Sequence, residues 1–220
     1  MHNFFNVFVF RYLFKKKQVK YSLKEDHIYI LLATVADVMP IRGINRLFAI
    51  NVLKNFDINK DFIFNNLFKI LNLNKKLNLG DLGFLIAPIF NAAGRLDNAN
   101  QIIELLVTNS NKKKLNILNN IHKLNNKRKI IQDNCIQDID FKKLSDEKGI
   151  LFLINQIIPE GIIGIIASKI KDLFDKPCIV FTQSNNIIKG SARSTLDFNI
   201  GEYIQKALNE KILLSGGGQI

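Results

Sequence analysis

The sequence contains no tryptophan, four prolines and two cysteines among its 220 residues. Cys135 and Cys178 stand far apart and neither has a CxxC partner, so their pattern predicts neither a disulfide framework nor a zinc site. A reduced, cytoplasmic compartment fits this cysteine usage best. The apolar start over residues 1–14 lacks a basic n-region and a cleavage site, and it is too short to span a bilayer. We therefore expect a core helix there, with no signal peptide and no membrane span.

Acidic residues are also scarce: 19 Asp and Glu stand against 31 Lys and Arg, which gives a formal net charge of +12. A clustered cationic face attracts a phosphate backbone, so this charge is typical of a nucleic-acid-binding protein. A general bias of the composition towards Lys, Asn, Ile and Phe explains the same charge, and the charge alone does not separate the two explanations. Hydrophobic residues make up 47% and charged residues 23%, as in ordinary folded proteins, so we expect an ordered chain.

The first half of the chain is predicted to be mainly helical. Apolar residues at helical spacing predict helices over residues 45–55 and within residues 57–79. The unbroken apolar run at 27–38 fits either a helix or a buried strand. Residues 115–139 carry one narrow apolar stripe, interrupted once at Arg128, and predict a long helix. Such a helix serves either as a strut between two domains or as a coiled-coil seam.

The pattern changes near residue 145, where we place a domain boundary. Continuous apolar runs predict strands at residues 149–154, at 178–181 and from 187 onward, with a helix over 161–174. Strand, helix and strand with short connections indicate an α/β unit.

Two segments of the first half contain polar residues that chemistry could use. Asp37 ends the apolar run, where a carboxylate is costly unless it is paired or bound to metal. The residues by themselves favour the other explanation, a capping or turn acid before Pro40. Asn91 and Arg95 enclose three small residues, and an arginine is suited to bidentate phosphate contact. A tight helix-packing turn gives the same pattern.

Two further segments lie in the second half. Residues 189–194 combine a glycine with two cations and two hydroxyls, and they fit either a phosphate cradle or a polar hairpin turn. The polar residues of this segment are Lys189, Ser191, Arg193 and Ser194. Residues 215–219 include Gly217 and Gly218, which by themselves indicate close backbone approach or flexibility.

The order of these segments resembles the RecJ family of the DHH phosphoesterases. The strings TVADVMP and NAAGRL are the most specific, and PEGIIGIIASKI, KGSARS and GGG follow in the family's order, from about residue 7 to residue 220. The resemblance implies an α/β fold in three parts, incomplete at both ends. Residues 1–108 would be the C-terminal part of a DHH catalytic domain, residues 109–142 a connector helix, and residues 143–220 most of a DHHA1 substrate-binding domain.

The resemblance also implies a function and a set of site residues. RecJ-like enzymes hydrolyse single-stranded DNA from 5′ to 3′ in repair and recombination, with Mn²⁺ or Mg²⁺ held by Asp and His. Asp37 matches a catalytic, metal-binding aspartate of the family. Asn91 and Arg95 match the string that lines the nucleic-acid path. The remaining residues expected to contact nucleic acid, with a terminal-phosphate pair at the serine and arginine of KGSARS, are Lys189, Ser191, Arg193, Ser194, Gly217 and Gly218.

Several positions depart from the family pattern. The Asp-x-Asp and DHH strings are absent, and Gln219 and Pro159 stand where the family has His. We therefore expect the chain to be inactive alone, with single-stranded DNA and a separately encoded N-terminal DHH fragment as partners. The alternatives are a non-catalytic nucleic-acid-binding remnant, a DHH hydrolase of short RNA or dinucleotides, and, more remotely, a tRNA-editing protein.

Overall fold

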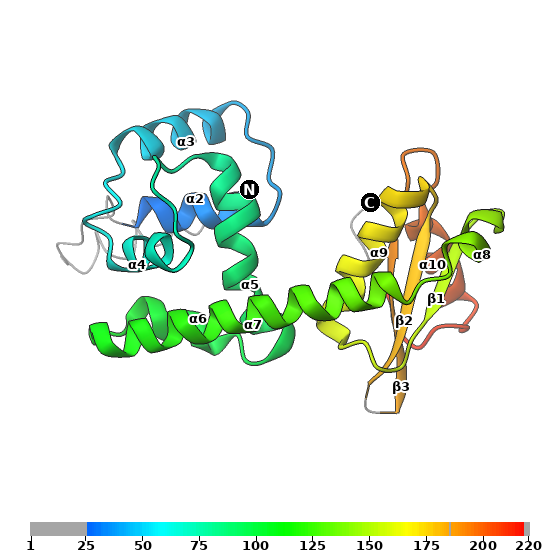
Figure 1. Cartoon of the computed structure of the whole chain (residues 1–220). Coiled ribbons are helices and arrows are strands. Elements are labelled where there is room, and N and C mark those ends of the chain that lie inside the picture. Colours follow the sequence, from blue (N-terminus) through cyan, green and yellow to red (C-terminus); the bar gives the residue numbers. More distant parts are fainter. Residues whose placement is uncertain (1–25, 185, 218–220) are drawn as a thin grey trace. The chain divides into compact units, whose positions relative to one another are not determined.

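The computed structural model describes residues 26–184 and 186–217, and these divide into two compact units (Figure 1). The first unit holds the described residues up to Ala93 together with Asn98–Asn125. The second holds Gly94–Asp97 and the described residues from Asn126 onward. The core helix expected over residues 1–14 lies outside the described residues, as do Gly218 and Gln219.

The first unit is built from helices. The alternative left open at residues 27–38 is settled in favour of a helix, and the predicted helix over 45–55 is confirmed. The NAAGR segment lies inside a helix, so our alternative of a turn there is wrong. The elements are α2 (His27–Ala36), α3 (Ile44–Asn55), α4 (Phe62–Ile70), the π-helix η1 (Asp81–Ile86), α5 (Ala87–Leu96), α6 (Asn100–Val107) and the first part of α7 (Asn111–Gln137).

Helix α4 illustrates how apolar spacing positions these helices. Its buried residues recur at intervals of three to four and form one face towards the core. Asp61 caps the helix by accepting a 2.9 Å hydrogen bond from the Phe64 N–H, and the Tyr29 hydroxyl donates to the same carboxylate at 2.8 Å. Burial, and then the negative charge of Asp61, raise the pKa of Tyr29 well above its usual range. This pair therefore fixes α4 against α2.

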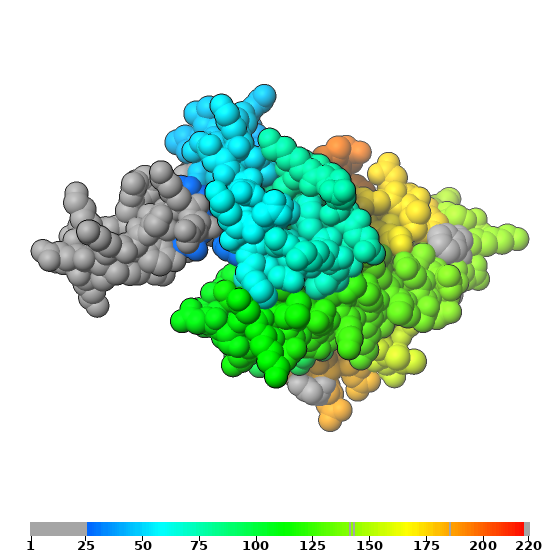
Figure 2. Space-filling model, turned by 60° about the vertical axis from the view of Figure 1, so that its left-hand side comes forward, coloured from blue at the N-terminus to red at the C-terminus, as the bar shows by residue number. Residues whose placement is uncertain are grey.

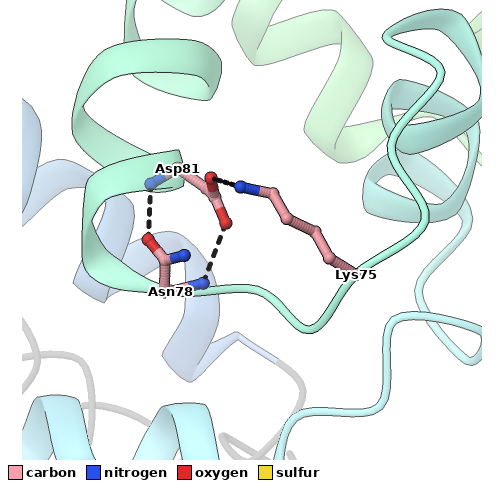
Figure 3. A network of polar contacts seen from close by, with 3 residues as sticks. All are labelled: Lys75, Asn78 and Asp81. Carbon is pink, nitrogen blue, oxygen red and sulfur yellow. Dashed lines mark hydrogen bonds and ion pairs between the residues drawn. The ribbon is translucent and has the colours of Figure 1, made fainter.

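The entry to the π-helix is held by a small polar network (Figure 3). Asp81 is 4% exposed, and its carboxylate accepts from Lys75 Nζ at 2.5 Å and from the Asn78 N–H at 3.2 Å. In return the Asp81 N–H donates to the Asn78 side-chain oxygen at 2.9 Å. The buried charge is thus neutralised within the unit, and the first N–H of η1 has a hydrogen-bond partner.

The second unit is an α/β unit, as predicted. Strand β1 (Leu151–Ile154) runs parallel to β2 (Cys178–Ser184), which is antiparallel to β3 (Ile187–Arg193). Helix α9 (Glu160–Phe174) connects the two parallel strands, and α8 (Phe141–Asp146) and α10 (Ile200–Asn209) complete the unit. The strand predicted over 178–181 extends to residue 184, because the whole of β2 pairs with β3.

Helix α9 covers the sheet with a fully apolar face. Its buried residues pack against alternate residues of β1 and β2, with Leu151, Cys178 and Val180 pointing to that side. Burial raises the pKa of the Cys178 thiol to about 11, so this cysteine is a core residue rather than a reactive thiol.

The predicted long helix is confirmed as α7, and the green residues in the middle of the chain are visible in Figure 2. Leu118 and Ile121 belong to the core of the first unit, whereas Ile131 and Cys135 pack against the core of the second. The apolar stripe is therefore used within the chain, which favours a strut over a coiled-coil seam. No helix in the described part of the chain is long and apolar enough to cross a membrane.

Candidate nucleic-acid interface

Arg193 lies at the end of β3 and is held by three hydrogen bonds. Its Nε donates to Ser168 Oγ at 2.9 Å, and its Nη1 donates to Ser191 Oγ at 3.2 Å and to the Ala192 carbonyl at 2.7 Å. Ser191 and Arg193 are two residues apart in a strand and therefore share one face of it. The KGSARS segment is thus mostly strand, so our alternative of a hairpin turn is wrong.

A glycine of α9 makes room for this guanidinium. A Cβ built on Gly164 would lie 2.8 Å from Arg193 Nη2 and 3.1 Å from Ser191 Oγ. Arg193 therefore crosses α9 directly over Gly164 and reaches Ser168, one turn further along the same helix. The rotamer of Arg193 is fixed by both the helix and its own strand.

Arg95 contacts the same helix one turn earlier. Its Nη1 donates to the Gly161 carbonyl at 2.8 Å, and a Cβ on Gly161 would lie 2.2 Å from the Arg95 carbonyl oxygen. Gly161 and Gly164 are three residues apart, so both arginines lie against one face of α9. Burial, and then the positive charge of Arg193, lower the pKa of Arg95. The fold therefore holds two like charges close to each other.

Arg128 is a third arginine of the second unit, near enough to Arg95 to feel its charge, and sequence analysis missed it. It is half-buried on α7, and its Nη1 donates to Gln132 Oε1 at 3.1 Å. Burial, and then the charge of Arg95, lower its pKa, while Asp133 acts in the opposite direction. The signal in the sequence was the single cation that interrupts the apolar stripe of this helix. We call Arg95, Arg128 and Arg193 the arginine cluster; all three belong to the second unit.

The other polar residues of KGSARS have partners within the protein. Lys189 Nζ lies 2.7 Å from Glu160 Oε2, and this hydrogen bond is the main cause that lowers the pKa of Glu160. Ser194 Oγ accepts from the Ile200 N–H at 3.1 Å, before α10. A Cβ built on Gly217 would have no other atom within 4 Å, so nothing packs closely against this glycine. The charge of Lys189 is thus already matched by a carboxylate of the same unit.

Asp37 belongs to no cluster of three or more candidate metal ligands within residues 26–184 and 186–217. It is exposed at the end of α2, where its N–H donates to the Ala33 carbonyl at 3.0 Å. The next residue, Val38, has a φ of 52°, a left-handed conformation that is rare for a β-branched residue. The described residues contain no group of three or more His, Cys, Asp and Glu that could hold a metal ion. Since each divalent ion needs several ligands, the residues that the structure describes do not fit a metal centre by themselves.

Asn91 lies one turn before Arg95 on α5 and is exposed. The two small residues that follow it, Ala92 and Ala93, are completely buried. The small side chains of this motif therefore serve helix packing, while its two ends carry the polar groups.

Comparison with known proteins gives one domain and one group of relatives. Residues 147–220 match the DHHA1 domain. The single-stranded-DNA-specific exonuclease RecJ of Haemophilus influenzae is 31% identical over 202 residues, which are 86% of this chain and 35% of that protein. RecJ of Escherichia coli is 30% identical over 200 residues, with the same coverage. The chain thus spans about a third of the length of the curated relatives that it matches.

Solved structures show the same fold. The crystal structure of RecJ from Thermus thermophilus in complex with Mn²⁺ matches with a TM-score of 0.80 at 24% identity, over 94% of this chain and 30% of that chain. The structure of the same protein with Mg²⁺ matches with a TM-score of 0.76 at 24% identity, over 94% of this chain and 32% of that chain. The α/β fold expected from the sequence is therefore confirmed.

Proposed function

From the similarity of this chain to the RecJ exonucleases and from its DHHA1 domain, we infer that it supplies the strand-holding part of a RecJ-type 5′-to-3′ single-stranded-DNA exonuclease. The observation that carries this proposal is the convergence of Arg95 and Arg193 on one face of α9, beside the Ser191 hydroxyl. Guanidiniums and hydroxyls held in fixed positions are suited to phosphate oxygens.

The chemistry of the arginine cluster favours the end of a strand. A terminal phosphate carries close to two negative charges near neutral pH, whereas an internal phosphodiester carries one. Half-buried guanidiniums that repel each other gain more from the doubly charged group, because it offsets their mutual repulsion. We therefore assign Ser191 and Arg193 to the 5′-phosphate, and Arg95 and the exposed Asn91 to the adjoining nucleic-acid path.

The metal chemistry needs residues beyond those described here. Mn²⁺ or Mg²⁺ would supply Lewis-acid activation at the phosphodiester, and Asp37 would be one of its ligands. In this proposal the remaining metal ligands belong to the part of a RecJ enzyme that the chain does not span. A separately encoded DHH fragment that binds this chain as a partner would supply them. The residues of this chain would bind and orient the DNA strand. The proposed compartment is the cytoplasm.

Binding and cleavage assays with the 220-residue chain test the proposal. We expect it to bind a single-stranded oligothymidylate, to prefer the 5′-phosphorylated form, and to release no mononucleotide in the presence of Mn²⁺. Arg193→Ala should lower the affinity for the phosphorylated strand about tenfold or more, since it removes a charge-assisted contact.

Lys148→Ala is the matched control, because Lys148 is an exposed cation of the same unit. It should shift the affinities for both strands by the same small factor. Equal losses in the two variants, with no end preference in the parent chain, would contradict the assignment of Ser191 and Arg193. Metal-dependent cleavage by the chain alone, abolished by Asp37→Asn, would contradict the proposal that most metal ligands come from outside this chain.

A further inference from the structure

Ser168 of α9 holds the side chain of Arg193 from outside its own strand. It lies one turn after Gly164 on the same face of the helix and is partly exposed. Its Oγ accepts from Arg193 Nε at 2.9 Å. Because β3 and α9 belong to the same unit and pack together, this hydrogen bond fixes the direction of the guanidinium relative to the helix.

The hydrogen bonds of Arg193 leave one of its nitrogens for a ligand. A guanidinium donates through Nε, Nη1 and Nη2. Nε donates to Ser168, and Nη1 donates to Ser191 Oγ at 3.2 Å and to the Ala192 carbonyl at 2.7 Å. No residue in the described part of the chain accepts a hydrogen bond from Nη2. Nη2 is therefore the donor that Arg193 presents to an anion.

The Ser191 hydroxyl lies beside Nη2. A Cβ built on Gly164 would lie 2.8 Å from Arg193 Nη2 and 3.1 Å from Ser191 Oγ, so both atoms lie next to the same point of α9. Ser191 Oγ accepts from Nη1 and keeps its own proton, for which the described residues provide no acceptor. Both side chains are partly exposed. A charged donor and a neutral donor that lie side by side can each take one oxygen of the same phosphate group.

This arrangement excludes the two-nitrogen contact that arginine commonly makes with phosphate. Such a contact uses Nη2 together with either Nε or Nη1. Both of those nitrogens already donate within the protein, Nε to Ser168 and Nη1 to groups of its own strand. Arg193 therefore has a single nitrogen to offer a phosphate, and a second hydrogen bond has to come from Ser191.

We propose that Ser168 is a positioning residue of the terminal-phosphate site: it accepts the Nε–H of Arg193 and thereby directs Nη2, together with the Ser191 hydroxyl, at one phosphate. This inference rests on the proposed function and deepens it, because it assigns the atoms that hold the phosphate and the residue that aims them. Ser168 itself does not contact the ligand. Without its hydroxyl, the Nε–H turns to water and the guanidinium is free to leave its place beside Gly164.

The test uses the 220-residue chain and an oligothymidylate with and without a 5′-phosphate. Ser168→Ala should lower the affinity for the phosphorylated strand about fivefold and change that for the other strand less than about twofold, because only the terminal-phosphate contact loses its support. NMR of the free chain gives a second reading. The Arg193 Nε–H signal should be sharp in the parent and should broaden through exchange with water in Ser168→Ala. Ser168→Thr, which keeps the hydroxyl, should restore both the signal and the preference for the 5′-phosphate.

Ser145→Ala is the matched control, because the exposed Ser145 hydroxyl donates to the Lys142 carbonyl within α8. It should change neither the signal nor the preference. If Ser168→Ala keeps the preference of the parent chain, or if Ser168→Thr does not restore it, the role of Ser168 is overturned and the proposed function stands. A parent chain without any preference for the 5′-phosphate would overturn the proposed phosphate grip itself, and this inference with it. Ser168→Val, which has the shape of Ser168→Thr without the hydroxyl, replaces Ser168→Ala should that variant unfold.

Discussion

The two units treat charged side chains in opposite ways. In the first unit, the buried carboxylate of Asp81 meets Lys75, and Asp61 meets the Tyr29 hydroxyl, so each polar group is satisfied locally. In the second unit, burial and then the charge of a neighbouring arginine lower the pKa of Arg95 and of Arg128. Paired charges stabilise a fold, whereas like charges held together cost free energy until a ligand of opposite charge binds. The comparison therefore agrees with the proposal that the fixed guanidiniums of the second unit bind phosphate.

The largest effect is expected from closing the space between α9 and Arg95. In Gly161→Ala, the added Cβ would lie 2.2 Å from the Arg95 carbonyl oxygen and 2.7 Å from its Cα, both of them backbone atoms. Because neither can turn away, the second unit should lose about 1–3 kcal/mol of unfolding free energy, measured by urea denaturation.

Gly164→Ala is the matched contrast for that substitution. Its Cβ would meet the far end of the Arg193 side chain, which can turn away at the cost of its hydrogen bonds to Ser168 and Ser191. We expect stability close to that of the parent chain but weaker binding of a 5′-phosphorylated strand. Equal stability of the two variants would show that α9 does not pack on Arg95 as described.

The sequence predicted those parts of the fold that depend on residues close together along the chain. Helices and strands followed from local apolar spacing, and α7 and α9 were placed within a few residues. Strand β3 was partly hidden, because Gly190 and the serines have low strand propensity. It forms because it pairs along the whole of β2. Gly190 is opposite Phe181 there, and a Cβ on Gly190 would lie only 2.9 Å from the Phe181 ring.

The site was predictable only in part. The resemblance to family motifs singled out Arg95 and Arg193. Both contact α9, but these contacts join residues far apart in the sequence, so no local sequence pattern predicts them. Arg128 was visible only as a gap in an apolar stripe. Lys189 was predicted to contact phosphate because it is a cation in the KGSARS segment. Its ion pair with Glu160 depends on how β3 lies beside α9, which the sequence does not reveal.

The paired charges of the first unit give the next prediction. Lys75→Ala removes the cation that pairs with the buried Asp81 carboxylate and leaves it the Asn78 N–H as a donor. This should cost about 1–2 kcal/mol of unfolding free energy, and the half-exposed lysine moderates the loss. Lys76→Ala, an exposed neighbour, should cost little. Neither variant should change the preference for a 5′-phosphate, and a loss of that preference in Lys75→Ala would break the separation between the units.

The smallest effect is expected where the second unit does pair its charges. Lys189→Ala removes an exposed ion pair with Glu160 and should change the unfolding free energy by about 0.5 kcal/mol or less. Because Lys189 lowers the pKa of Glu160, the contribution of the pair is present at neutral pH and is lost as the pH falls through that lowered pKa. Strand affinity should fall by less than about threefold. A loss as large as that of Arg193→Ala would move the site from the arginine cluster to Lys189.

The central claim is that the second unit holds a terminal phosphate with fixed guanidiniums, and NMR of the arginine Nε–H groups tests it most directly. The full chain, labelled with ¹⁵N, would be titrated with an oligothymidylate that carries a 5′-phosphate and with the same strand lacking it. We predict that the Arg193 and Arg95 signals shift strongly with the phosphorylated strand and weakly with the other. Signals of the arginine cluster that stay in place, or that move equally with both strands, would contradict the claim.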